Sequence, residues 1–157
     1  ALTFADKVVV MYDGEVVQTG APEELFGKPR HTFVGYFIGS PGMNVMPARI
    51  DGATAHVMEC PVPLGRRYRH VTGERVEIGV RPEFARLSRQ GPGLPVSIRR
   101  IEDVGRFRII RATCGGKEVA VVAKEGEPVD ENAEWVTFDP DAVNVYADGW
   151  LVEGEAA

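Results

Sequence analysis

The sequence lacks any apolar run that could span a membrane, and its start has no secretory signal pattern. The longest apolar run covers residues 8–12, far short of the roughly 20 residues that a transmembrane helix needs. The sequence also lacks a Gly-x-x-x-x-Gly-Lys-Ser/Thr loop, the short motif that cradles nucleotide phosphates. These absences predict a soluble, intracellular chain without a phosphate-binding loop of this type.

Cysteine and histidine are also scarce, which argues against a metal centre. Cys60 and Cys114 lack the close spacing of metal-ligating cysteines, so we expect two buried or half-buried thiols rather than a disulfide. The histidines lie far apart and stand beside no second ligand, so we expect them at the surface. They are His31, His56 and His70. Carboxylate pairs occur without a matched partner and are interpreted as turns and strand ends. No residue is assigned to catalysis or to a metal.

The formal net charge of −5 hides an uneven distribution of charge along the chain. Residues 66–111 carry twelve Lys or Arg against five Asp or Glu, whereas residues 112–157 carry two against eleven. We interpret these two segments as neighbours within one fold that neutralise each other.

The first forty residues are predicted to hold a hairpin and short helices, too little chain to enclose a stable core. Residues 7–12 and 15–19 are rich in β-forming residues and flank Asp13-Gly14, a composition that favours a two-residue hairpin turn. Pro22 opens a short helix, and residues 1–5 are interpreted as the end of a helix that begins upstream. This part of the chain therefore needs a larger partner to pack against.

A second helix leads into the junction between two predicted domains. Three of its aromatic residues recur at i, i+3 and i+4 and share one helical face, which we expect to bury against another surface. They are Phe33, Tyr36 and Phe37. Gly39 favours a left-handed helix cap, and Pro41-Gly42 turns the chain. We therefore divide the chain into residues 1–40 and residues 41–157.

After the junction the hydrophobic pattern has a period of two, which predicts short strands. Residues 44–50 and 54–59 flank Asp51-Gly52, interpreted as a second hairpin turn, and Gly115-Gly116 forms a third. A late strand covers residues 135–138. Strands with turn residues every eight to twelve positions, roughly, predict a closed or nearly closed barrel of the OB type. The expected fold class is mainly β, with a small α+β segment before the barrel.

Several short runs in the first 44 residues match one protein family in order and spacing. They cover residues 1–11, 13–15, 18–20, 22–26, 29, 32–34 and 37–44. These runs resemble the ATP-binding subunits of ABC importers for sugars and polyol phosphates, the maltose and glycerol-phosphate type. The resemblance implies that residues 1–40 close a nucleotide-binding domain and that residues 41–157 form a carboxy-terminal regulatory domain of the OB-like TOBE class. Ala21 departs from the family, which usually has a capping Ser or Thr there.

The resemblance implies a role in assembly rather than in chemistry. The chain carries none of the family's ATP-binding motifs, so ATP and magnesium are expected only in a longer parent chain, an ATPase that energises uptake of a sugar or polyol phosphate. The implied partners are a second ATP-binding subunit, as a homodimer, and transmembrane permease subunits. A regulatory protein or a small ligand is a further candidate. The implied location is the cytoplasmic side of the plasma membrane, held there through the transporter.

Residues that match the family's motifs are the candidate regulatory or interface residues. They are Gly39, Ser40, Pro41, Met43 and Asn44 at the junction, then Gly79, Arg81, Pro82 and Glu83, and finally Trp150. The resemblance implies that the arginine and the glutamate fix the geometry and contacts of the regulatory domain. A purely structural alternative is a turn that locks two strands by one charge-assisted hydrogen bond. The tryptophan either covers one end of the barrel or belongs to an interface.

A second class of function stays open on the basis of charge. An OB-like barrel could bind a small anion, another solute or single-stranded nucleic acid in a basic groove. The groove would be lined by Arg66, Arg67, Arg69, Arg99, Arg100, Arg106, Arg108 and Arg111. The acidic segment that follows and the few aromatic residues between the arginines make nucleic acid the weaker expectation.

Overall fold

The computed structural model describes residues 6–156. Strands β1 (Val8–Tyr12) and β2 (Glu15–Gly20) form an antiparallel hairpin, which confirms the predicted turn. Asp13 and Gly14 both have positive φ, as this turn requires. Helices α1 (Pro22–Gly27) and α2 (Thr32–Phe37) follow. The helix expected over residues 1–5 lies outside the described residues.

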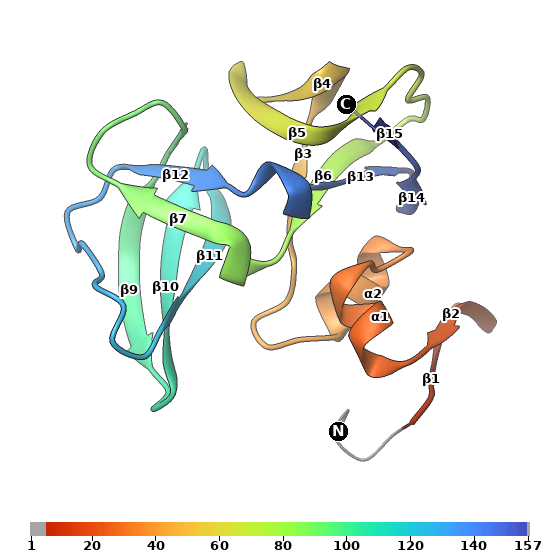
Figure 1. The fold of residues 1–157 in the computed structure, drawn as a ribbon, viewed down its shortest axis with the longest axis horizontal. Helices are drawn as coiled ribbons and strands as arrows, with labels where there is room; N and C mark the ends of the chain where they lie inside the picture. The colour runs from red at the N-terminus through yellow and green to blue at the C-terminus, as the bar shows by residue number, and fades with distance from the viewer. Residues whose placement is uncertain (1–5, 157) are drawn as a thin grey trace.

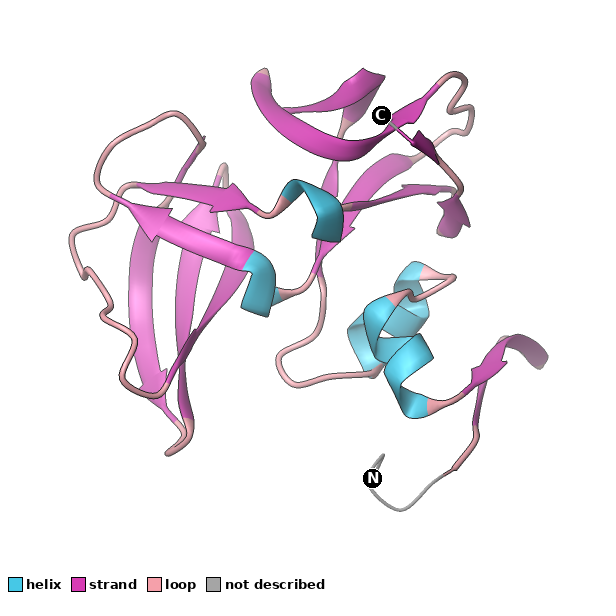
Figure 2. Cartoon of the chain, in the orientation of Figure 1, coloured by secondary structure: helices cyan, strands magenta, loops and turns pink. Residues whose placement is uncertain are grey.

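The rest of the described chain is a succession of short strands (Figure 2). They are β3 (Asn44–Pro47), β4 (Arg49–Val57), β5 (Cys60–Tyr68), β6 (Val76–Val80), β7 (Ala85–Ser88), β8 (Leu94–Pro95), β9 (Ser97–Asp103), β10 (Phe107–Cys114), β11 (Lys117–Lys124), β12 (Trp135–Phe138), β13 (Asn144–Ala147), β14 (Trp150–Val152) and β15 (Glu155–Ala156). Short 3₁₀ helices cover Pro82–Phe84 and Pro140–Ala142. The architecture confirms the predicted mainly β fold.

The strands form two groups around a continuous hydrophobic core (Figure 1). One group contains the sheets β14-β13-β6-β3 and β15-β5-β4, and the other contains β11-β10-β9 and β7-β12-β8. Fully buried residues from both groups belong to the same cluster, so the two groups fold as one body. Among them are Ile78, Val80, Ile110, Val136 and Val145.

The hairpin and the two helices have a small core of their own. Val10, Leu25, Val34 and Ile38 are buried in it. The expectation that the aromatic face of the second helix is the buried one is wrong, because Val34 and Ile38 fill that role. Phe37 is 71% exposed. Two of the three aromatic residues of the helix, Phe33 and Phe37, instead stack on each other with ring centroids 5.8 Å apart.

The predicted hairpin at Asp51-Gly52 is wrong. Both residues lie inside β4, where Gly52 has a φ of 61° and the pairing register with β5 shifts, as it does at a β-bulge. The chain reverses at Met58 and Glu59, whose φ angles are 48° and 66°. Positive φ is uncommon for such residues, so the sequence carries no turn signal at that position.

The charged segments pair with each other as expected. Four ion pairs join the basic residues 66–111 to the acidic residues 112–157. These pairs are Arg66–Glu153, Arg69–Glu155, Arg89–Asp130 and Arg111–Glu118. The arginines of the alternative basic groove lie on or next to β5 and on or next to β9 and β10, which belong to different sheets. They do not line one strand face or one sheet.

Candidate regulatory junction

Arg81 lies just after β6 and reaches across to the ends of both helices. Its Nε donates to the carbonyl oxygen of Phe26 at 3.0 Å, and its Nη1 donates to the carbonyl oxygen of Gly35 at 2.9 Å and to that of Ile38. The guanidinium carbon also lies 4.4 Å from the centroid of the Phe26 ring. Carbonyl groups at helix ends lack partners within the helix, and a cation there interacts favourably with them. We call this set of contacts the Arg81 clamp.

The Arg81 clamp is buried, with 4% of the arginine exposed. Burial lowers the pKa of Arg81, while the nearby Glu83 and Tyr146 act in the opposite direction. Within residues 6–156, its Nη2 is a buried donor without a hydrogen-bond partner. The clamp differs from the lock between two strands considered above, since its hydrogen bonds run from a strand end to main-chain oxygens of the helical segment.

The glycines of the junction leave the space that the clamp occupies. Gly39 has a φ of 107°, and a β-carbon there would lie 2.9 Å from Nη1 of Arg81. A β-carbon on Gly42 would lie 2.7 Å from the carbonyl oxygen of Tyr36. Between these glycines, the Ser40-Pro41 peptide bond is cis. Side chains at either glycine would therefore push the linker away from the helices.

Met43 fills the gap between helix α2 and strand β6. It is 3% exposed, and its backbone N–H donates to the carbonyl oxygen of Gly35 at 3.0 Å. A β-carbon on Gly79 would lie 2.7 Å from the methyl group of Met43 and 2.8 Å from Cε1 of Tyr146. Gly79 therefore allows the methionine and the tyrosine to pack directly on the strand.

Two further side chains bind the linker and the helical segment to the two groups of strands, which together we call the barrel. The amide of Asn44 donates to the carbonyl oxygen of Ala120 and accepts from its N–H, both at 2.9 Å. It pairs with β11 as a neighbouring strand would. The hydroxyl of Tyr146, on β13, donates to the carbonyl oxygen of Pro29 at 2.7 Å, and burial raises its pKa. Tyr146 was not among the candidates chosen from the sequence. The only signal there was an aromatic residue in a predicted late strand.

Trp150 lies at the opposite end of helix α2 from the clamp. Its ring meets that of His31 edge to face, with centroids 4.7 Å apart, and it is 49% exposed. His31 caps the helix, because its Nδ1 accepts from the N–H of Phe33 at 3.0 Å. The interpretation of His31 as a plain surface histidine is therefore wrong. The alternative in which Trp150 covers a barrel end does not match this packing.

Pro82 and Glu83 begin the 3₁₀ helix that follows Arg81. Pro82 is fully buried, and Glu83 is partly exposed. The structure thus gathers most of the sequence-predicted residues around the ends of helix α2, with Asn44 turned toward β11 and Glu83 outside the clamp.

Comparison with known proteins finds a matching domain family and several relatives of this chain. Residues 39–84 match the family described as the MalK OB fold domain. The chain is 34% identical over 128 residues to "sn-glycerol-3-phosphate import ATP-binding protein UgpC 2" of Agrobacterium fabrum, covering 80% of this chain and 34% of the relative. It is 33% identical over 153 residues to "Uncharacterized ABC transporter ATP-binding protein y4oS" of Sinorhizobium fredii, covering 89% and 41%. It is 30% identical over 151 residues to "sn-glycerol-3-phosphate import ATP-binding protein UgpC" of Escherichia coli K12, and the match covers 93% of this chain and 42% of the relative.

The chain is related to ABC importer ATP-binding subunits. The matches confirm the resemblance seen in the sequence and the OB-like fold class. The chain spans about two fifths or less of the length of these relatives. The matched OB segment, residues 39–84, contains every sequence-predicted site residue except Trp150.

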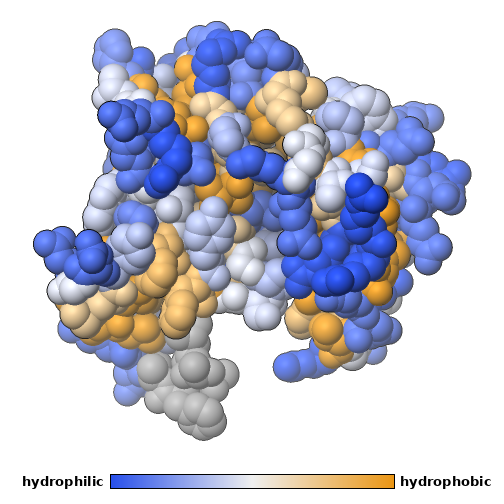
Figure 3. All heavy atoms as spheres, turned by 180° about the vertical axis from the view of Figure 1, so that it is seen from behind, coloured by the Kyte–Doolittle hydropathy of each residue, from blue (hydrophilic) through white to orange (hydrophobic). Residues whose placement is uncertain are grey.

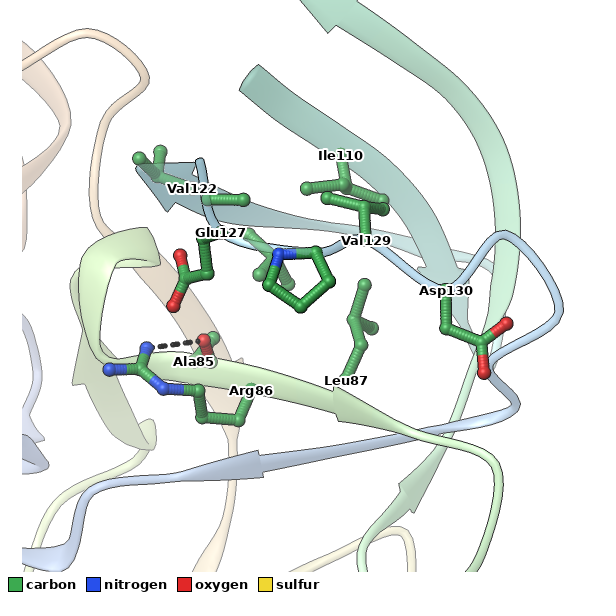
Figure 4. A pocket seen from close by; sticks show the side chains of 11 residues that line it. Ala85, Arg86, Leu87, Ile110, Val122, Glu127, Val129 and Asp130 are labelled. Carbon is green, nitrogen blue, oxygen red and sulfur yellow. Dashed lines mark hydrogen bonds between the residues drawn. The ribbon is translucent and has the colours of Figure 1, made fainter. Parts of the chain in front are cut away.

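The chain also has a pocket of about 260 Å³ in the second group of strands (Figure 4). Leu87, Ile110 and Val129 contribute apolar side chains, while Arg86 and Asp130 lie toward its edge. Nη1 of Arg86 donates to the carbonyl oxygen of Ala85, so part of the arginine's hydrogen-bonding capacity is already used. No group of three metal-binding side chains occurs in the described part of the chain.

The hairpin of this chain presents apolar side chains to solvent. Val9, Met11 and Val16 are each more than half exposed, and Phe37 is 71% exposed. Seen from behind, hydrophobic residues gather at the lower left of the molecule, where the hairpin lies (Figure 3). No helix among residues 6–156 is long and apolar enough to cross a membrane.

Proposed function

We propose that this chain is the carboxy-terminal regulatory and dimerisation segment of an ABC importer ATPase subunit that energises uptake of a sugar or a polyol phosphate. The printed names of the relatives and the OB-fold match support this assignment. ATP and magnesium would bind to the longer parent chain, outside these 157 residues. The partners would be a second copy of the subunit and permease subunits, which would hold the protein at the cytoplasmic face of the membrane.

The observation that carries the proposal is the Arg81 clamp. Its three acceptors belong to the ends of α1 and α2, and its donor belongs to the barrel, so a displacement of the helices displaces the barrel with them. Asn44 adds a second attachment, from the linker to β11. The arrangement supports transmission of movement by a rigid connection, with no chemistry in this segment.

The first test is the native size of the protein in its source cells. An antibody against this chain should detect a species larger by about one domain, on the order of 200 residues. Peptides of that species should include a Gly-x-x-x-x-Gly-Lys-Ser/Thr motif. A species of the chain's own size would contradict the proposal and indicate a free-standing binding module.

The second test places substitutions in the native subunit and measures ATP-dependent uptake of labelled sn-glycerol-3-phosphate. Arg81→Met should reduce uptake severalfold, because the barrel loses its attachment to the helices. Arg106→Met serves as the matched control, since Arg106 is exposed and lies in the β9–β10 turn. Equal uptake by both variants, at equal protein abundance, would contradict a transmitting role.

Dimerisation is tested on the chain itself. Analytical ultracentrifugation at tens of micromolar should give twice the mass of 17.2 kDa. A monomeric mass at that concentration would remove the proposal that the barrel alone joins two subunits.

A second candidate function, binding of a small anion or solute, is favoured by the pocket beside Arg86. Calorimetric titration of the chain with phosphate, glycerol phosphate and sugars should then release heat that Arg86→Ala abolishes. Single-stranded nucleic acid is the weaker form of this alternative, because ion pairs already engage Arg66, Arg69 and Arg111. Fluorescence anisotropy with a labelled strand at low salt tests it, and an unchanged signal would exclude it.

A further inference from the structure

Two turns from different sheets meet at one end of the core. Met58 lies in the turn between β4 and β5, and its sulfur packs so closely on Gly115 that no β-carbon would fit there. Gly115 lies in the turn between β10 and β11. Cys60 begins β5 just after the first turn, and Cys114 ends β10 just before the second. The contact between the turns therefore brings together the two cysteines of the sequence.

The two thiols have unequal environments. Cys114 is 3% exposed and belongs to the main hydrophobic core, while Cys60 is half-buried and packs against the same core cluster. Burial raises the pKa of the Cys114 thiol, and the proximity of Cys60 raises it further. A thiol with a raised pKa carries little thiolate, so the more open Cys60 is the one that reacts first with an oxidant in solution.

We propose that Cys60 and Cys114 form a reversible intramolecular disulfide when the protein meets a peroxide. The Cys60 thiolate attacks the O–O bond and takes one oxygen as a sulfenic acid, and the hydroxide that leaves gains a proton to become water. The sulfur of Cys114 then attacks the sulfur of Cys60, the S–O bond breaks, and a second water leaves. Two thiols are oxidised and one peroxide is reduced to two waters. A dithiol reductant restores both thiols by exchange.

The disulfide would join the sheet β15-β5-β4 to the sheet β11-β10-β9. It would close the loop from residue 60 to residue 114, which restricts the unfolded chain. We expect the thermal unfolding midpoint to rise by roughly 8–17 °C, because closing a loop of this length contributes about 4 kcal/mol in a chain of this size. The bond would thus strengthen the contact between the two groups of strands without involving the Arg81 clamp.

The test is intact mass spectrometry of the full chain after treatment with hydrogen peroxide and alkylation under denaturing conditions. The wild type should lose about 2 Da and resist alkylation until it is reduced. Cys114→Ser should stop at the Cys60 sulfenic acid, which a 1,3-diketone traps, whereas Cys60→Ser should stay largely unreactive. Thermal unfolding of the reduced variants confirms that they are folded, and alanine replaces serine at the same position in any variant that is not.

Two results would overturn the proposal. One is a peroxide-treated wild type in which both thiols are still alkylated as in untreated protein. The other is a disulfide that joins two chains, visible as a doubled mass without reductant. Both outcomes concern these 157 residues alone, so they are independent of whether the importer function proposed above is correct.

Discussion

Replacing Arg81 by methionine removes the charged donor of the clamp but leaves a long, unbranched apolar side chain in its place. Arg81 donates to three main-chain oxygens, and hydrogen bonds that involve a charged group contribute about 1.5–3 kcal/mol each. Burying a charged group costs several kcal/mol, which offsets a large part of that sum. We expect a net loss of about 3–4 kcal/mol, a substantial share of the roughly 5–15 kcal/mol that stabilises a domain.

The assay is equilibrium unfolding in urea, followed by tryptophan fluorescence and by hydrogen exchange. Trp150 packs on the N-terminal cap of α2, and Trp135 lies on β12, so the two rings report on different parts of the molecule. In R81M, backbone amides of α1 and α2 should exchange faster at urea concentrations where β10 and β11 stay protected. Lysine at position 81 should rescue only part of the loss, because it lacks the planar fork that reaches separate acceptors.

Arg86→Met is the matched control for stability. Arg86 is exposed and donates to nearby main-chain oxygens of its own segment, so its loss should cost less than about 1 kcal/mol. If R81M and R86M unfolded at the same urea concentration with the same slope, the clamp would contribute nothing beyond a surface arginine. The reasoning from buried charge-assisted hydrogen bonds would then be refuted.

Three other substitutions test separate contacts. Asn44→Ala should lower the free energy of unfolding, measured in urea, by about 2–3 kcal/mol, because it leaves two buried main-chain groups of β11 without partners. An Asn44→Ala protein as stable as wild type would count against that pairing. Ala21→Ser should stabilise it by about 0.5–2 kcal/mol, since α1 has no side-chain cap, and an unchanged urea midpoint would contradict this. Burial, and then the charge of Arg75, lowers the pKa of His31, so its stabilising effect should be full above its ordinary value near 6.5 and should disappear as the pH falls through the lowered value. His31→Asn can still cap the helix and should flatten that pH dependence below about pH 6.5, whereas the same slope in both proteins would contradict it.

Much of the secondary structure follows from local signals in the sequence. The turns at Asp13-Gly14 and Gly115-Gly116 and the strand over residues 135–138 were predicted where the structure has them. The error at Asp51-Gly52 has a physical cause. A glycine with positive φ serves a tight turn and a bulge equally well, and only the long-range pairing of β4 with β5 decides between them.

The site was less accessible to sequence reasoning than the strands. Resemblance pointed to Arg81 and Asn44, but their partners are main-chain atoms of residues 43 to 76 positions away, and a main-chain carbonyl has no sequence signature. His31 was misread because a histidine cap acts through one ring nitrogen and needs no neighbouring ligand. Tyr146 was overlooked because its hydroxyl finds its acceptor only after β13 and the helices come together.

The small size of the helical core explains why the junction depends on polar contacts. Four buried apolar residues hold the hairpin and the helices together. Other apolar side chains of the hairpin and of α2 are exposed on the outer surface. Beside the packing of Met43, directional hydrogen bonds from Arg81 and Tyr146 align the helices on the strands. Because these bonds fix angle as well as distance, rotation of the helices would either break several of them together or turn the barrel. A junction built in this way favours movement of the two parts as one body.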